Sequence, residues 1–143
     1  MYNASMNKPL SILVVDDDPM NLQVAEVILK SAGHAVSVAH NGADAVDRCI
    51  DQGLRYDLIL MDLNMPVMSG LEATKLLRGH PELESTPIVF VTGSGDFEKL
   101  AMEAGADRYF TKPFRRKQLL DFLATTFVER GLLAPGESFI HQA

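Results

Sequence analysis

The chain has 143 residues, 47% of them hydrophobic, and a net charge of −6. A chain of this length favours a single domain that can bury a core without a disulfide or a metal to hold it together. The acidic balance argues against nucleic-acid binding by this domain, and no apolar run approaches the ~18 residues of a membrane span.

The cysteine and histidine content excludes some kinds of disulfide and metal site. Cys49 is the only cysteine, which excludes an internal disulfide and a cysteine-based zinc site. We interpret it as a buried small side chain, compatible with a reducing, cytoplasmic setting. The histidines lack the spacing of metal ligands, and we interpret them as surface or loop residues; they are His34, His40, His80 and His141.

The first predicted strand, 10–15, stops at three consecutive carboxylates, Asp16, Asp17 and Asp18. A helix is predicted over 19–32, because Asp suits a helix N-cap and Pro suits the first helical position. Capping gives Asp18 a structural role. Asp16 and Asp17 are left without one, side by side at the end of a strand.

The alternation of strand and helix then continues. A strand at 34–40 and a helix at 42–52 precede 58–61, a run of four apolar residues that ends at Asp62. Four consecutive apolar residues suit a strand buried on both faces. In open α/β sheets, ligands bind beyond the carboxyl ends of the strands. Asp62 therefore sits where chemistry is expected, ahead of a helix at 70–79.

The second half supplies two more strands and two more helices. They are expected at 87–91, 96–104, 107–111 and 114–130. The first of these strands leads into Thr92 and the second into Lys112. Five strands alternating with five helices predict one doubly wound α/β domain with a parallel sheet. We place that domain at 10–130, between a flexible lead-in at 1–9 and a tail or linker stub at 131–143.

The carboxyl ends of four predicted strands gather Asp16, Asp17, Asp62, Thr92 and Lys112 at one edge of the sheet. Close carboxylates repel each other by on the order of 4 kcal/mol at 4 Å and an effective dielectric of ~20, so we expect a compensating cation. Oxygen ligands without thiolates suit Mg²⁺, or Mn²⁺. A metal, a hydroxyl and a lysine around one carboxylate indicate phosphoryl binding.

Four motifs, VVDDDPMN, MDLNMPVMSG, VTGSG and YFTKPF, together resemble the response-regulator receiver domain of two-component signalling. The resemblance covers residues 9–130 and implies a flavodoxin-like (βα)5 fold with strand order 2-1-3-4-5. It also implies a regulatory domain rather than an enzyme. The implied function is to accept a phosphoryl group from a phosphohistidine, on a histidine kinase or a histidine phosphotransfer protein.

The resemblance assigns roles to single residues. Asp62 is the implied phosphoacceptor. The implied metal site comprises Asp62, Asp17 in direct contact, Asp16 largely through water, and the backbone carbonyl of Asn64.

The remaining implied roles concern the response to phosphorylation. Thr92 and Lys112 are expected to contact the phosphoryl oxygens, and Thr92 and Tyr109 to form the switch. The Lys112–Pro113 peptide bond is expected to be cis. The helix at 96–104, the strand of Tyr109 and the start of the last helix are expected to bind partners, with a homodimer as one possibility.

Two alternatives stay open at this point. Asp16-x-Asp18 imitates the nucleophile motif of haloacid-dehalogenase phosphohydrolases, but Pro19 and Met20 stand where that family carries Thr, and Lys112 replaces a late acidic pair. A receiver-like interaction module without phosphorylation is the other, although such modules normally lack one of the key acidic or lysine residues. The aspartate that becomes phosphorylated separates these interpretations.

Overall fold

A computed structural model describes residues 9–93, 95–112 and 116–129 of the chain. Five parallel strands form one sheet in the order β2-β1-β3-β4-β5. The strands are β1 (Ser11–Val15), β2 (Ala35–Ala39), β3 (Leu58–Met61), β4 (Ile88–Thr92) and β5 (Arg108–Thr111). The predicted parallel sheet and its strand order are confirmed.

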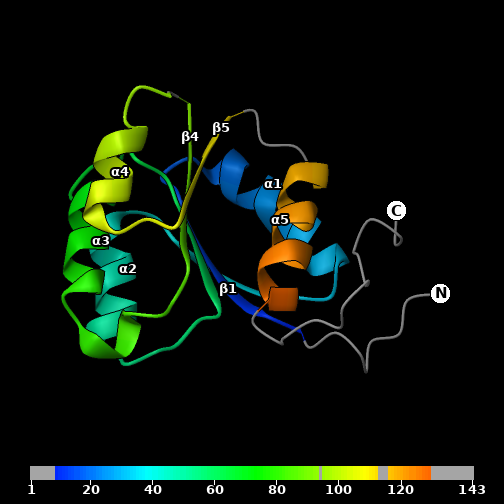
Figure 1. Cartoon of the computed structure of the whole chain (residues 1–143), viewed down its shortest axis with the longest axis horizontal. Helices are drawn as coiled ribbons and strands as arrows, with labels where there is room; N and C mark the ends of the chain where they lie inside the picture. The colour runs from blue at the N-terminus through cyan, green and yellow to red at the C-terminus, as the bar shows by residue number, and fades with distance from the viewer. Residues whose placement is uncertain (1–8, 94, 113–115, 130–143) are drawn as a thin grey trace.

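Two layers of helices enclose the sheet (Figure 1). On one face lie α1 (Pro19–Ser31) and α5 (Arg116–Glu129). On the other lie α2 (Gly42–Val46), α3 (Gly70–Arg78) and α4 (Glu98–Ala104). The fold is therefore the doubly wound α/β architecture that the alternating sequence pattern predicts. Among the described helices, none is long and apolar enough to cross a membrane.

Local signals explain where the helices begin. Asp18 caps α1 by accepting a hydrogen bond from the backbone N–H of Met20 at 2.9 Å, as predicted. Ser69 and Glu72 form a reciprocal capping box at the start of α3. Gly33, just after α1, has a φ of 96°, a left-handed conformation that favours glycine.

Two segments differ from the prediction. The expected helix at 42–52 is α-helical only through α2 and continues as a π-helical segment, η1 (Asp47–Asp51). A short 3-10 helix, η2 (Pro81–Leu83), precedes β4 and was not predicted. Other boundaries shift by one or two residues. The lead-in before residue 9 and the tail from 131 onward lie outside the described residues.

In the part of the chain that the structure describes, the core consists of two apolar clusters, one on each face of the sheet. The α1–α5 face contributes side chains such as Leu22, Leu29 and Leu119, and the other face contributes Leu77 and Phe90. All four residues of β3 are buried, as expected for a central strand covered by helices on both sides. Rigid packing on both faces fixes the carboxyl end of β3, where Asp62 follows.

Arg78 joins α3 to three other segments at the opposite edge of the sheet. Its Nη1 donates to the carbonyl oxygens of Leu83 and Thr86, both at 2.7 Å. Its Nε donates to the carbonyl of Gly105 at 2.9 Å, and its Nη2 pairs with Asp107 at 2.8 Å. One guanidinium thus ties together the ends of α3, η2, α4 and the start of β5.

His34 lies outside the helices and strands, between α1 and β2, as one part of the prediction allowed, but it is not a surface residue. Its side chain is 5% exposed, and its Nδ1 accepts a hydrogen bond from the backbone N–H of Leu10 at 3.0 Å. Burial lowers the pKa of His34 to about 4, although the charge of Asp57 opposes this change. His40 is exposed, as predicted. Cys49 is buried, as predicted, and burial raises the pKa of its thiol.

Candidate functional site

The predicted site residues meet because hydrogen bonds between strands continue past the strand ends. The backbone N–H of Asp62 donates to the carbonyl of Val15 at 2.9 Å, and that of Lys112 to the carbonyl of Thr92 at 2.6 Å. Asp16 follows β1 directly, so its Cα lies beside that of Asp62 at the same edge. Polar side chains therefore lie close together at the carboxyl ends of four strands, β1, β3, β4 and β5.

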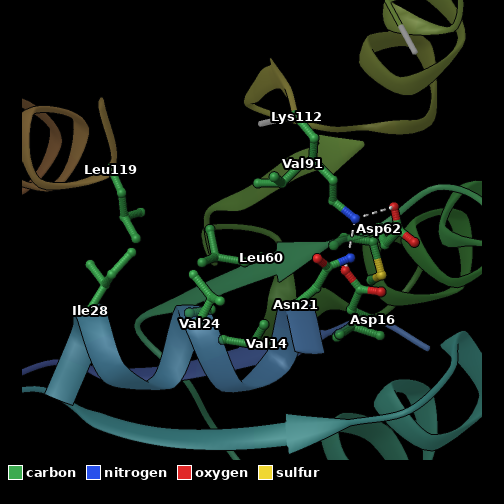
Figure 2. Close-up of a pocket in the computed structure, with 13 residues that line it drawn as sticks. Val14, Asp16, Asn21, Val24, Ile28, Leu60, Asp62, Val91, Lys112 and Leu119 are labelled. Carbon is green, nitrogen blue, oxygen red and sulfur yellow. Dashed lines mark hydrogen bonds and ion pairs between the residues drawn. The ribbon is translucent and has the colours of Figure 1, made fainter. Parts of the chain in front are cut away.

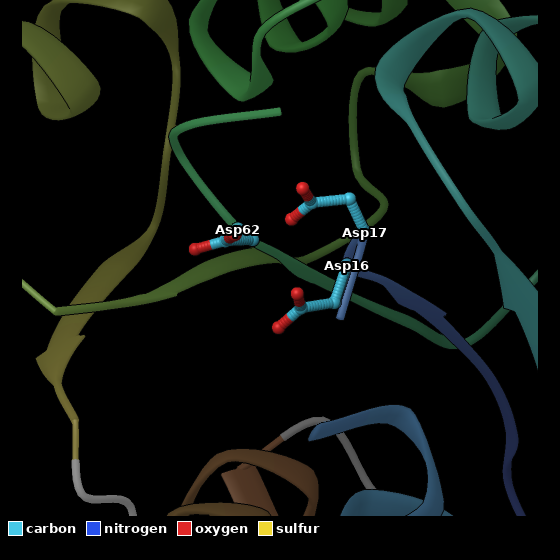
Figure 3. Close-up of side chains that lie close together, drawn as sticks. All are labelled: Asp16, Asp17 and Asp62. Atoms are coloured by element: carbon cyan, nitrogen blue, oxygen red, sulfur yellow. The ribbon is translucent and has the colours of Figure 1, made fainter. Parts of the chain in front are cut away.

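The three carboxylates of Asp16, Asp17 and Asp62 form one cluster (Figure 3). One oxygen of each lies within 4.8 Å of an oxygen of the other two. Asp16 and Asp62 are 5% and 8% exposed, whereas Asp17 is exposed. An oxygen-only cluster with two buried members and one open side suits a hard divalent cation such as Mg²⁺.

Lys112 provides the positive charge within this cluster. Its Nζ lies 2.9 Å from Oδ2 of Asp16 and 3.5 Å from Oδ1 of Asp62, so it is held mainly by Asp16. Burial lowers the pKa of Lys112, but its hydrogen bond to Asp16 and the charge of Asp62 outweigh this and raise it. The pKa of Asp62 is raised by burial and by the charge of Asp16, and the charge of Lys112 opposes that rise.

The loop after Asp62 closes tightly around the backbone of that residue. A Cβ at Gly70 would collide with the carbonyl oxygen of Asp62, so only glycine fits there. Within the loop, the N–H of Met68 donates to the carbonyl of Pro66 at 2.8 Å, a three-residue turn. Its central residue, Val67, has a φ of 71° and is strained, because β-branched side chains strongly disfavour positive φ.

Thr92 and Tyr109, the two predicted switch residues, lie on the neighbouring strands β4 and β5. Thr92 is 2% exposed at the end of β4, and a Cβ at the following Gly93 would meet no atom within 4 Å. The Tyr109 ring stacks on Phe90 with centroids 6.2 Å apart. Burial raises the pKa of Tyr109, while a hydrogen bond from the backbone of Phe97 opposes this change. Tyr109 therefore links β5 to the start of α4.

Two other predicted site residues are Asn64 and Pro113. Asn64 is exposed, two residues after Asp62. Pro113 lies outside the described residues, so the predicted cis bond after Lys112 stays a prediction.

A cavity of about 440 Å³ extends from the acidic cluster between α1, α5 and the sheet (Figure 2). Asp16, Asp62 and Lys112 line its polar end, and its remaining walls are mostly aliphatic. The Asn21 side chain, from the first turn of α1, points toward this polar end. The sequence analysis missed Asn21. Its position three residues after the N-cap Asp18 was the available signal, because that position faces back toward the cap.

Comparison with known proteins shows which family and which solved structures this chain resembles. The profile of the response regulator receiver domain matches residues 12–124. The two-component response regulator ORR41 of Oryza sativa subsp. japonica is 42% identical over 122 residues, covering 82% of this chain and 94% of that protein. Hybrid signal transduction histidine kinase I of Dictyostelium discoideum is 37% identical over 128 residues, covering 82% of this chain. This chain spans only 7% of that kinase's length.

A solved structure shows the same fold. The receiver domain of the sensor histidine kinase PA1611 from Pseudomonas aeruginosa PAO1 aligns with a TM-score of 0.76 and 33% identity. The match covers 82% of this chain and 97% of that chain, and that structure has a magnesium ion coordinated in its active site cleft.

Proposed function

Because this chain belongs to the response regulator receiver domain family, we propose that Asp62 accepts a phosphoryl group from a phosphohistidine and thereby switches one face of the domain. Receiver domains are regulatory phosphoacceptor domains of two-component signalling. The placement of Asp62 carries the proposal. It is a buried carboxylate at the end of the central strand, with a lysine ammonium at 3.5 Å and two further carboxylates, Asp16 and Asp17, beside it.

The donor set fits a divalent cation. The cluster carries three carboxylates and one lysine, so it has an excess of negative charge on oxygen ligands. We propose that Asp17, Asp62 and the backbone carbonyl of Asn64 hold Mg²⁺ directly, with Asp16 acting largely through water. Mn²⁺ shares these ligand preferences. When bound, the metal offsets the negative charge of the carboxylates and of the transferred phosphoryl group.

The transfer exchanges one bond for another. An oxygen of Asp62 attacks the phosphorus of the phosphohistidine, the new P–O bond forms as the P–N bond breaks, and the imidazole leaves with the electron pair. The charge of Lys112 opposes the raised pKa of Asp62 and so favours the ionised, nucleophilic carboxylate. Lys112 and the Thr92 hydroxyl then neutralise and bind phosphoryl oxygens.

The test is to identify the phosphorylated residue with Mg²⁺ and acetyl phosphate as a small phosphodonor. We expect one hydroxylamine-sensitive label in the wild type, no label in the nearly isosteric Asp62→Asn variant, and no label after chelation of the metal. Asp18→Asn is the matched control, because asparagine also caps helices, and it should label normally. A label on Asp16 would instead support a phosphohydrolase, and an unlabelled wild type would support a non-phosphorylated interaction module.

The phosphohistidine donor needs a surface beside the site. On α1, Met20, Val24 and Val27 are 71%, 51% and 63% exposed, and their spacing places them on one side of the helix. We propose that a histidine kinase or phosphotransfer protein packs on these side chains. Val27→Glu should then slow transfer from a protein donor and leave labelling by acetyl phosphate unchanged. Equal loss with both donors would contradict this docking surface.

The surface that binds a downstream partner can be inferred from the position of Tyr109, which contacts the backbone of Phe97 at the start of α4. Phe97 is the N-cap residue of α4 and offers no side-chain cap, so its backbone hydrogen bond to Tyr109 couples that end of α4 to movement of the tyrosine. We propose that α4, β5 and the start of α5 bind the downstream partner or a second copy of the chain. Amide exchange with beryllofluoride, a phosphoryl mimic, should change over 96–104 and 109–112. Changes confined to the acidic cluster would exclude this face.

A further inference from the structure

The side chain of Asn21 does not form the capping-box hydrogen bond that is typical of its position in a helix. It is the third residue of α1 after the N-cap, where a capping-box side chain binds the N–H of the cap residue. In α3, Glu72 does this for Ser69 at 3.3 Å. In α1, the N–H of Asp18 instead donates to Oδ1 of Asp16 at 2.9 Å. The N–H of Asp18 therefore does not need the Asn21 side chain as its acceptor.

Within the cavity, the Asn21 side chain lies beside the acidic cluster. The residues that α1 places along the cavity after it are apolar, namely Val24, Ala25 and Ile28. Asn21 stands at the polar end, half-buried, and its carboxamide points toward Asp16 and the Lys112–Asp62 pair in Figure 2. Among the described residues, its side chain forms no hydrogen bond. Asparagine is also a poorer helix former than alanine, so local helix stability does not explain it.

Asp16 is the group that needs such a donor. Its Oδ1 accepts from Asp18, and its Oδ2 accepts from Lys112 at 2.9 Å. If Lys112 turns to a phosphoryl group on Asp62, Oδ2 of a carboxylate that is only 5% exposed loses its donor. A buried acceptor left without a donor is unfavourable. A neutral amide can replace the ammonium there without adding a charge that competes with a metal ion.

We propose that Asn21 is a positioning residue, whose side-chain N–H takes over Oδ2 of Asp16 when Lys112 moves to the phosphoryl group on Asp62. The inference rests on the proposed function, because it requires Lys112 to leave Asp16. It assigns Asn21 to the phosphorylated state, so its loss should weaken that state and leave the resting state nearly unchanged.

The experiment compares two affinities in the full chain. Mg²⁺ binding is measured by calorimetry, and beryllofluoride binding by ¹⁹F NMR at saturating Mg²⁺. We expect Asn21→Ala to weaken beryllofluoride binding about tenfold, equivalent to ~1.4 kcal/mol, and to keep the Mg²⁺ affinity within about twofold of the wild type. Asn21→Asp keeps the shape but removes the donor, and should weaken beryllofluoride binding at least as much. The control is Gln23→Ala, which removes an exposed carboxamide from the same helix and should change neither affinity.

The outcomes separate this inference from the function on which it rests. If the wild type binds beryllofluoride and Asn21→Ala binds it equally well, the inference is overturned and the proposed function stands. Parallel losses in Mg²⁺ affinity, beryllofluoride affinity and urea stability would show a purely structural role and would also overturn it. If the wild type neither binds beryllofluoride nor becomes labelled on Asp62, both fail together.

Discussion

His34 should make the stability of this protein depend on pH between about 4 and 6.5. Its neutral imidazole accepts a hydrogen bond from the N–H of Leu10, and burial lowers its pKa from 6.5 to about 4. A lowered pKa means that the unfolded chain binds the proton more tightly than the folded protein does. The stabilisation is therefore complete above pH 6.5 and is lost as the pH falls toward 4.

The magnitude follows from the two pKa values. A pKa of 6.5 in the unfolded chain and about 4 in the folded protein corresponds to about 3 kcal/mol in the free energy of unfolding across the whole range. About 2 kcal/mol of this should be lost between pH 7 and pH 5. Acid also protonates other groups toward the lower end of this pH range, so the comparison is made as a difference between variants rather than from one curve.

The assay is urea unfolding at pH 7, 6 and 5 for the wild type, His34→Asn and His40→Asn. In His34→Asn, the carbonyl oxygen of the new carboxamide can accept the same bond from Leu10 but cannot be protonated in this range, so this variant should lack the loss of about 2 kcal/mol. His40 is exposed, and its variant should follow the wild type. Parallel curves for the wild type and His34→Asn, or an imidazole titrating near its ordinary pKa by NMR, would refute the argument.

Two further substitutions test strain and anchoring. Val67→Gly should raise the free energy of unfolding by about 1 kcal/mol, because it relieves a positive φ at a side chain that is 83% exposed; a loss measured by urea unfolding would mean that the turn is not strained. Arg78→Met should cost about 2–4 kcal/mol, because it removes the guanidinium donor from the carbonyls of Thr86 and Gly105, and leaves that of Leu83 only the backbone N–H of Thr86. Lys75→Met, at an exposed position of the same helix, is its control, and equal effects of the two would contradict the anchoring role.

The order of the helices and strands, and the end of the sheet at which the candidate site lies, could be predicted from the sequence. Apolar runs of four to six residues and capping signals such as Asp18 act within a few residues, so they could be read locally. The meeting of Asp16, Asp62 and Lys112 was also predictable, because the carboxyl ends of parallel strands share one edge. These inferences require the type of each element and its position in the chain, but no knowledge of side-chain packing.

Which of these side chains form hydrogen bonds and ion pairs with each other could be learned only from the three-dimensional structure. Lys112 pairs more closely with Asp16, 96 positions away in the chain, than with Asp62. His34 is buried, and its Nδ1 accepts a hydrogen bond from the backbone N–H of Leu10, 24 positions away in the chain. Arg78 likewise binds Gly105 and Asp107, which lie 27 and 29 positions further along the chain, and no local sequence pattern predicts these contacts. Each of these depends on distances near 3 Å between residues far apart in sequence, and such distances are set by how the helices pack on the sheet rather than by any propensity of the residues themselves.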